Sequence, residues 1–576
     1  KYFPKCWKKA FTILIHKKRD NVDPANFRPI TLQPVFAKVY SSLIRNRIYD
    51  FLLKNNFIES QIQKGFWKGI SGTIEHTEML SYLIDHARNK QRQLIITLLD
   101  IKNAFGEVDH YLLKKVLDYH YLPQEIQSII TEYYQNYYIT IGTNNYRTNP
   151  IHVGKGVLQG DCLSPLLFNM IVNTLIKTID QEKIKCMGYN FCETLSPRHW
   201  FQCADDSALV TSTVQDSQLL LNVFTKWCTW ANLIVRIDKC KTFGMKKNGN
   251  TTSQFLPYLR INDEMIPPVE MHESFNYLGK IFSFKMGVET IKKDITERFN
   301  CYIEKLNMLP MHPKNKLLVI SKFVYSKIRW EFSIYNFGVT WVTQNLDSII
   351  KEYVKRWLHL PQSANFSHLY LPVKQLGLKF SLPSDIFKNS QLTTRNILKN
   401  SKSKDIAEIH KSTQYKHIAE EFLLMKAHTK KPRDGLKNET IEQISRSLGQ
   451  LKEQNIILKM IQQHCLSSSI VEWQRVVDKL PENLFVFIRK ALIFCLPNNS
   501  NLARWKKSVD SACGLCKTNT QTQLHILNNC QSSVISGRYT WRHNSVLTTL
   551  CNYLTQLPEF TLFADIPGYQ NPSIFF

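Results

Sequence analysis

Short apolar runs alternate with longer stretches of helical periodicity in the first half of the chain. Residues 94–101 (LIITLLDI) and 203–210 (CADDSALV) have the length and composition of buried strands, although each contains acidic residues. Residues 35–54 carry apolar side chains at helical spacing. Residues 164–179 do so as well, with Ser164 as the predicted N-cap and Pro165 at the first helical position. The pattern predicts an α+β architecture for this half.

The pattern becomes mainly helical and basic beyond residue 285. Residues 291–309 and 315–330 have the periodicity of amphipathic helices. Residues 427–440 combine Pro, Gly and several charges, which indicates a linker or an exposed loop. A small segment rich in Cys and His follows near the C-terminus. We therefore expect four parts, which are residues 1–285, a helical part 286–400, a helical linker region 401–500 and a final segment 501–576.

Length and charge narrow the class of protein. A chain of 576 residues is too long for one core, and 43% hydrophobic residues indicate a folded protein. The net charge of +27 predicts a polyanionic partner, for which nucleic acid is the default. The 14 cysteines are scattered, which suits a reducing compartment. No apolar run reaches membrane-spanning length. Because the chain does not begin with Met, we expect it to start inside a larger protein.

Two adjacent carboxylates, Asp205 and Asp206, stand between apolar flanks. Burying such charges costs several kcal/mol unless they are paired or bind a metal. Asp100 ends the apolar run 94–101. If neighbouring strands bring Asp100 and Asp205 together, the pair is suited to hold two Mg²⁺ ions for phosphoryl transfer. The alternative is that Asp100 caps a helix beginning near Lys102 and that Asp205–Asp206 lie in a hairpin turn.

Seven segments in order resemble the reverse transcriptases of non-LTR retrotransposons. The resemblance covers nearly the whole chain and implies a right-hand polymerase, with fingers and a palm built on an antiparallel sheet in residues 1–285 and a helical thumb in 286–400. The segments are DPANFRPITLQPVFAKVYSSLIRNRI (23–48), QKGFWKGISGTIEHT (63–77), LLDIKNAFGEVDH (98–110), GVLQGDCLSPLLFN (156–169), ADDSALV (204–210), DKCKTFG (238–244) and YLGKIF (277–282).

The resemblance implies catalytic roles for several of these residues. Asp100 and Asp205 would ligate two catalytic Mg²⁺ ions, with Asp206 as a supporting carboxylate. Phe105 resembles the steric gate that excludes ribonucleotides, although a Phe at this position also suits an ordinary core. Lys239 resembles the lysine that protonates the pyrophosphate leaving group, and Lys241 is a near alternative.

The resemblance also implies residues that bind the incoming nucleotide. Gln159 and Gly160 look like the nucleotide-binding loop, and Lys17 and Arg28 like the fingers residues that hold the triphosphate. Ordinary surface charge remains the alternative for Lys17 and Arg28. The sequence departs from the family pattern at three positions. Cys203 replaces a frequent aromatic residue, while Cys162 and His16 each replace a proline.

A Cys/His pattern near the C-terminus predicts a structural zinc site. Cys513, Cys516, His525 and Cys530 have the spacing C-x2-C-x8-H-x4-C, which suits tetrahedral coordination. Buried cysteines with a core histidine are the alternative. The pattern resembles the knuckle of a site-specific retrotransposon subgroup that carries a restriction-like endonuclease, whose next segment resembles residues 538–550 with Arg542, His543 and Asn544. We find neither the endonuclease pattern nor N-terminal DNA-binding fingers in this sequence.

The implied function is that of an RNA-directed DNA polymerase. It would copy element RNA from a nicked target-DNA primer with dNTPs, in the nucleus after cytoplasmic synthesis and RNA association, without a membrane partner. A group II intron-type reverse transcriptase or maturase is an alternative, which the terminal knuckle disfavours. A domesticated, catalytically silent nucleic-acid-binding scaffold is another, which the presence of Asp100, Asp205 and Asp206 disfavours.

Overall fold

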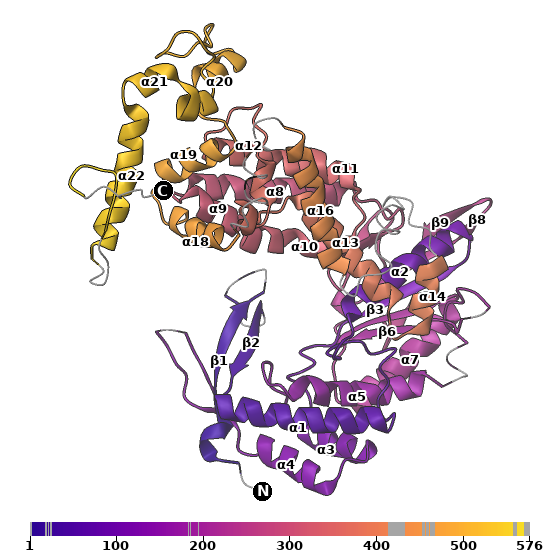
Figure 1. The fold of residues 1–576 in the computed structure, drawn as a ribbon. Helices are drawn as coiled ribbons and strands as arrows, with labels where there is room; N and C mark the ends of the chain where they lie inside the picture. The colour runs from indigo at the N-terminus through magenta and orange to yellow at the C-terminus, as the bar shows by residue number, and fades with distance from the viewer. Residues whose placement is uncertain are drawn as a thin grey trace. The chain divides into compact units, whose positions relative to one another are not determined.

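The computed structural model divides the chain into two compact units, which are described separately (Figure 1). The first contains residues up to 290 together with 331–336 and 390–412. The second contains residues 291–330, 337–389 and the described residues from 432 onward. The structure describes residues 3–17, 20, 22–23, 26–143, 145–181, 184, 186–193, 195–412, 432–451, 456, 460, 467–556 and 562–569.

A five-stranded antiparallel sheet forms the centre of the first unit, as the sequence predicted. Its strand order is β6-β7-β3-β8-β9. The strands span Trp200–Cys203 (β6), Asp206–Thr211 (β7), Leu94–Leu99 (β3), Lys241–Asn248 (β8) and Thr251–Phe255 (β9). The segment CADDSALV was expected to be one strand, and this was wrong. It is the hairpin β6–β7, because the chain reverses at Ala204–Asp205.

Alternate side chains of β3 enter two different cores, which explains why its apolar run is continuous. Ile95 and Leu99 pack with helices α5 (Ser164–Ile179) and α7 (Val214–Trp230) on one face of the sheet. Leu94 and Ile96 pack with α2 (Gly72–Asn89) on the other. Burial on both faces holds the end of β3, and therefore Asp100, in a fixed place.

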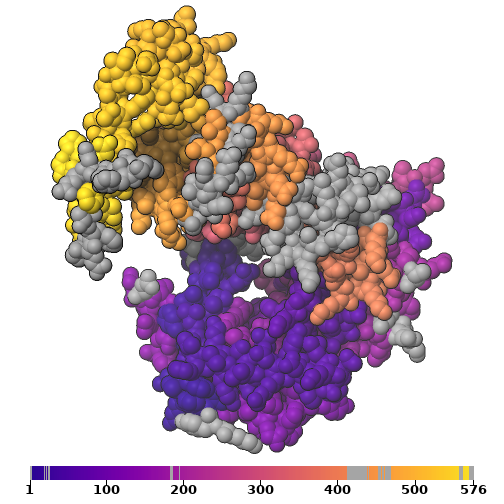
Figure 2. Space-filling model, in the orientation of Figure 1, coloured from indigo at the N-terminus to yellow at the C-terminus, as the bar shows by residue number. Residues whose placement is uncertain are grey.

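A second sheet has the order β2-β1-β4-β5, with β1 and β2 before β3 in the chain and β4 and β5 after it. Strands β1 and β2 form an antiparallel hairpin beside the helical layer that contains α1, which spans Val35–Lys54 as predicted (Figure 1). In the space-filling view, the part of this unit before residue 290, coloured indigo to magenta, forms one continuous body (Figure 2). The remaining bounds are Lys9–His16 (β1), Phe27–Leu32 (β2), Tyr138–Ile141 (β4), Ile151–His152 (β5), His110–Tyr119 (α3) and Gln124–Tyr134 (α4).

Two predicted local features differ in the structure. Ser164 is the first residue of α5, and the N-cap is Leu163. The Ser164 hydroxyl does not cap the helix because it donates to Asp161 (3.3 Å) and also contacts the Tyr134 hydroxyl (3.2 Å). Helix α16 spans Pro432–Gly449, so the predicted linker is helical from residue 432 on, since proline suits a first helical turn. Residues 427–431 of that linker lie outside the described residues.

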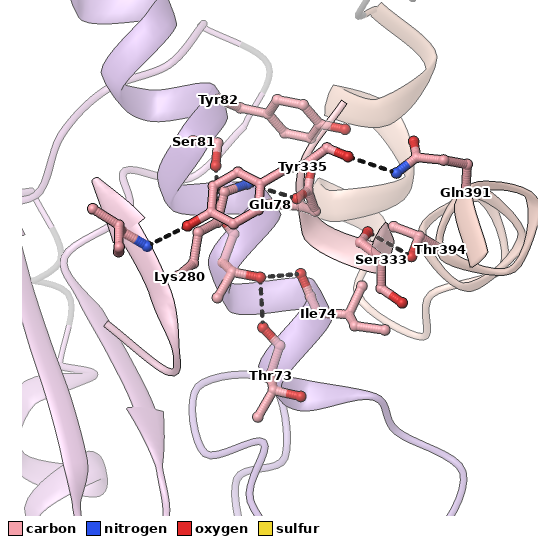
Figure 3. Close-up of polar contacts among 12 residues, drawn as sticks. Thr73, Ile74, Glu78, Ser81, Tyr82, Lys280, Ser333, Tyr335, Gln391 and Thr394 are labelled. Carbon is pink, nitrogen blue, oxygen red and sulfur yellow. Dashed lines mark hydrogen bonds and ion pairs between the residues drawn. The ribbon is translucent and has the colours of Figure 1, made fainter. Parts of the chain in front are cut away.

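Three separate parts of the chain meet beside the hairpin of β12 (Ser274–Tyr277) and β13 (Lys280–Ser283). Lys280 pairs with Glu78 of α2 at 2.8 Å, and the Ile281 N–H donates to the Tyr335 hydroxyl at 2.6 Å (Figure 3). Gln391 donates to the carbonyl of Tyr335 at 3.0 Å. These contacts explain why residues 331–336 and 390–412 belong to the first unit.

The second unit is built mainly of helices, and the helices expected over 291–309 and 315–330 are present. Their bounds are Glu289–Met308 (α8), then Pro313–Val319 (α9), a π-helical turn Ile320–Val324 and Tyr325–Ile334 (α10). Among the described residues, no helix combines the length and the apolar character needed to cross a membrane. The other helices of this unit are Val339–Val342 (α11), Ser348–Trp357 (α12), Ser467–Val477 (α18), Glu482–Leu492 (α19), Asn499–Arg504 (α20), Gln531–Ile535 (α21) and Arg538–Leu554 (α22). Helix α13 (Pro383–Lys399) is divided between the two units, and α14 (Lys404–Ser412) belongs to the first.

Candidate active site and zinc-binding cluster

Strand register brings the three predicted carboxylates to one edge of the central sheet. Leu99 of β3 pairs with Ser207 of β7, so the next residue, Asp100, lies beside Asp206. Cys203 pairs with Asp206, which leaves Ala204 and Asp205 as the two-residue turn between β6 and β7. Carboxylates that are 105 positions apart in sequence therefore share one site.

The carboxylates repel one another at this edge. Burial raises the pKa of Asp205, with the charge of Asp100 adding to the effect. Burial and the charges of Asp205 and Asp100 together raise the pKa of Asp206 to about 6. Within the described part of the chain, neither Asp205 nor Asp206 forms an ion pair. A cluster of carboxylate oxygens with unmatched negative charge fits divalent cations, and Mg²⁺ prefers such oxygen ligands.

Asp100 has one basic neighbour that the sequence did not predict, Arg236. Arg236 places its Nε 3.9 Å from the Asp100 carboxylate, and its backbone N–H donates to the Asp100 carbonyl at 2.9 Å. Burial raises the pKa of Asp100, and the charges of Lys239 and Arg236 act against that rise. Arg236 comes just before the segment DKCKTFG, and nothing in its own sequence pattern indicated this contact.

The helix-cap alternative for Asp100 is wrong. The next helix, α3, begins at His110, and its N-cap is Asp109. The Asp109 carboxylate accepts hydrogen bonds from the N–H groups of Tyr111 (2.7 Å) and Leu112 (3.1 Å). The alternative that placed Asp205 in a hairpin turn is correct about its position. This turn does not exclude a shared site, because Asp205 meets the other carboxylates there.

The turn at Ala204–Asp205 has a strained backbone. Ala204 has a φ of 58°, in the left-handed region that costs a residue with a Cβ about 1–2 kcal/mol. Such conformations persist where surrounding contacts impose them, and they cluster at functional sites.

Phe105 lies in an aromatic group next to the carboxylate edge. Its ring stacks on Phe168 of α5 with a centroid distance of 4.5 Å and an interplanar angle of 19°. Phe66 approaches it edge-on at 6.1 Å. Phe105 is partly exposed while Phe168 is buried, so Phe168 supports the back of a ring whose other parts remain accessible.

The loop with Gln159 and Gly160 packs on strand β2. The Gln159 carbonyl accepts from the Thr31 N–H at 2.7 Å. Gly160 has a φ of 114°, and a Cβ at this position would lie 2.5 Å from the Thr31 carbonyl oxygen. Only glycine fits this backbone, which joins the loop to the strand that carries Arg28.

Two exposed basic residues of the β1–β2 hairpin act on the carboxylates through their charge. Against the effect of burial, Arg28 favours the ionised form of Asp205 and Asp206 and so lowers their pKa. Lys17 has the same effect on the pKa of Asp100, more weakly than Lys239. The structure thus brings the residues predicted to bind nucleotide and metal to one region of the first unit.

Cys203 precedes the turn and pairs with Asp206 across the hairpin. Burial, with the charges of Asp206 and Asp205, raises the pKa of its thiol to about 12. The thiol therefore stays neutral at physiological pH. This departure from the family pattern adds no charge beside the carboxylates.

The four predicted zinc ligands converge in the second unit. One ligand atom from each of Cys513, Cys516, His525 and Cys530 lies within 4.8 Å of the others. Hydrogen bonds from the Thr518 side chain and from the amides of Asn519 and Thr518 lower the pKa of the Cys516 thiol to about 5. These bonds favour the thiolate, which is the form that binds metal. A set of three sulfurs and one imidazole fits Zn²⁺.

A tyrosine joins the Cys/His cluster to helix α22. The Tyr539 hydroxyl accepts from the Cys530 N–H at 3.0 Å and donates to the Ile526 carbonyl at 3.2 Å. Arg542 lies over the Tyr539 ring, and the exposed His543 contacts Asn544 at 3.1 Å. The cluster therefore fixes the start of the helix that carries these polar residues.

Comparisons with known proteins indicate the family of this domain. Residues 15–282 match the family "Reverse transcriptase (RNA-dependent DNA polymerase)". The chain is 25% identical over 65% of its length to a Pol polyprotein from a type-1 retrotransposable element R2 of Nasonia vitripennis, covering 35% of that protein. It is 22% identical over 94% of its length to the Pol polyprotein of element R2DM of Drosophila melanogaster, covering 49% of it.

A third relative comes from another element. The chain is 25% identical over 55% of its length to the RNA-directed DNA polymerase from mobile element jockey of Drosophila melanogaster, covering 33% of it. The chain thus spans half or less of the length of these curated relatives. The relatives favour a retrotransposon polymerase over the maturase and scaffold alternatives. Residues 15–282 thus form a reverse transcriptase domain that is similar to those of the R2 and jockey retrotransposable elements.

Proposed function

We propose that this protein extends the 3′-OH of a DNA primer along an RNA template, with dNTPs as substrates. The observation that carries the proposal is the convergence of Asp100, Asp205 and Asp206 at one sheet edge within the matched domain. The net charge of +27 supports binding of a template–primer duplex through its phosphates. The mainly helical residues 286–400 would act as the thumb that holds this duplex.

Each residue of the site has a proposed role in nucleotidyl transfer. Arg28 and Lys17 would bind the triphosphate, and Gln159 with Gly160 would contact the incoming nucleotide. Phe105 would press against the sugar and disfavour a 2′-OH. Lys239, whose charge reaches Asp100, would give a proton to the departing pyrophosphate.

The carboxylates would hold two divalent cations. Asp100 and Asp205 would be the main ligands, and Asp206 would support them. When bound, Mg²⁺ supplies charge stabilisation for the attacking and leaving oxygens in an in-line displacement. In the second unit, Cys513, Cys516, His525 and Cys530 would hold one Zn²⁺ that stabilises the fold of the cluster.

The C-terminal cluster supports a more specific proposal. Its match to the knuckle pattern, together with the R2 relatives, favours target-primed synthesis, in which a nicked genomic site is the primer. The protein would then act in the nucleus on the RNA of its own element.

Primer extension tests the proposed function directly. We expect the protein to extend a DNA primer on an RNA template in Mg²⁺, and Asp205→Ala to lower the rate by about a thousandfold or more because a metal ligand is lost. Asp206→Ala should lower the extension rate by a smaller factor. RNA binding without extension by the wild-type protein would contradict the proposal and favour a scaffold.

Replacing Phe105 by valine should weaken discrimination against ribonucleotides. A smaller side chain leaves room for a 2′-OH, so we expect the ratio of kcat/KM for dNTP over rNTP to fall by about tenfold or more, with dNTP extension kept within about threefold. Single-nucleotide extension kinetics measure the ratio. Phe57→Val is the matched control, because Phe57 is also half-buried but packs with Phe51 and Tyr121. An unchanged ratio in Phe105→Val would assign that ring to the core alone.

A further inference from the structure

The side chain of Gln63 binds the strained turn that carries Asp205. Its Oε1 accepts from the Ala204 N–H at 2.9 Å, and its Nε2 donates to the Ala204 carbonyl at 3.2 Å. One carboxamide thus pairs with both backbone groups of a single residue, as a neighbouring strand would. Gln63 is 1% exposed, so these bonds are shielded from water.

Other contacts fix Gln63 itself. Its Oε1 also accepts from the Gly65 N–H at 2.8 Å, and its carbonyl accepts from the Trp67 indole at 2.8 Å. Asn169 of α5 donates to the Gly65 carbonyl at 2.9 Å. A Cβ on Gly65 would lie 2.5 Å from the Ala204 nitrogen, so the two backbones are in direct contact. The segment around Gln63 is therefore a rigid support for the turn.

The two backbone groups of Ala204 depend on Gln63 to different degrees. The carbonyl has a second donor, because Gln202 Nε2 lies 2.8 Å from it. The N–H donates to Gln63 alone among the described residues. Gln202 is held in turn by the Trp200 indole and the Ser207 hydroxyl, each 2.8 Å from its Oε1. Loss of the Gln63 amide would thus leave the N–H of the strained residue unpaired in a buried place.

We propose that Gln63 is a positioning residue of the polymerase site, which holds Ala204 in the left-handed conformation that directs Asp205 toward Asp100. The inference rests on the proposed function, since it concerns the geometry of the same carboxylates. It adds a residue from a distant segment whose side-chain amide binds the backbone of Ala204 and Gly65.

The test replaces Gln63 by methionine, which keeps the length of the side chain and removes its hydrogen bonds. Gln61→Met is the matched control, because Gln61 is exposed two residues away. A third variant adds Ala204→Gly to Gln63→Met, since glycine adopts a φ of 58° without steric cost. The readouts are extension kinetics and equilibrium Mn²⁺ affinity measured by electron paramagnetic resonance.

We expect Gln63→Met to lower kcat by about tenfold or more and to leave KM for dNTP within about twofold. Mn²⁺ affinity should fall by about fivefold or more. In the variant that also carries Ala204→Gly, both kcat and Mn²⁺ affinity should be at least about threefold higher than in Gln63→Met alone. The inference would be overturned if Gln63→Met had the same kcat and Mn²⁺ affinity as the control Gln61→Met. It would also be overturned if kcat fell while Mn²⁺ affinity stayed unchanged. If the wild-type protein extends no primer, the proposed function fails, while the Mn²⁺ measurement still decides the role of Gln63.

Discussion

Asp100→Asn is expected to lower kcat for primer extension by about a thousandfold or more, which corresponds to a loss of about 4 kcal/mol in transition-state stabilisation. Asparagine has nearly the same shape but no negative charge, so the site would lose part of its attraction for divalent cations. The fold should remain intact, because the change relieves repulsion with Asp205 and Asp206. Single-turnover extension at saturating Mg²⁺, with a thermal melt of each variant, measures both effects.

Asp109→Asn is the matched control for this prediction. It makes the same chemical change nine positions along the chain, at the N-cap of α3, where asparagine caps a helix about as well as aspartate. We expect its activity to stay within about twofold of wild type. If Asp100→Asn kept more than about a tenth of the wild-type rate, the assignment of Asp100 as a metal ligand would fail.

Cys513→Ser is expected to abolish zinc binding and to unfold the cluster around it. A closed zinc site contributes about 10–16 kcal/mol of apparent binding energy to folding, and a serine oxygen replaces the thiolate poorly. Backbone amides within residues 513–530 should then lose protection from hydrogen exchange. Metal analysis should find about one zinc ion per wild-type chain and close to none in the variant.

Cys551→Ser serves as the control for this second prediction. Cys551 is also buried, but it packs with Ala564 and Ile566 and is not one of the four converging residues. Its replacement should keep the zinc and cost about 1 kcal/mol. Full protection of residues 513–530 in chelator-treated wild-type protein would show that the cluster folds without metal, and would favour the alternative of buried cysteines with a core histidine.

Much of the site could be predicted from ordered sequence motifs, because few residue types can bind metal ions or phosphates. The order and spacing of the motifs that contain Asp100, Phe105, Gln159 and Asp205 indicate the family from sequence alone. Local backbone details were less accessible. The Ser164 hydroxyl does not cap α5 because it contacts Asp161, three residues earlier, and Tyr134 of α4, and the second contact exists only in the folded chain. The sequence left open whether residues 203–210 form one strand or contain a hairpin turn, because the apolar residues that flank Ala204–Asp205 resemble one continuous strand.

By itself, the sequence determined the alternation of strands and helices, the carboxylate motif and the set of four Cys and His residues, because periodicity and ligand chemistry are local properties. The antiparallel palm was implied by the resemblance of the ordered motifs to a known family. Tertiary structure alone decided how these parts combine. The register of β3 against β7 placed Asp100 beside Asp206, and Gln63 came to bind the backbone of Ala204 across a separation of 141 residues. The contact of Arg236 with Asp100 arose in the same way. Such contacts depend on which strands and loops pack together. The residue type at one position does not predict which distant residue it will contact.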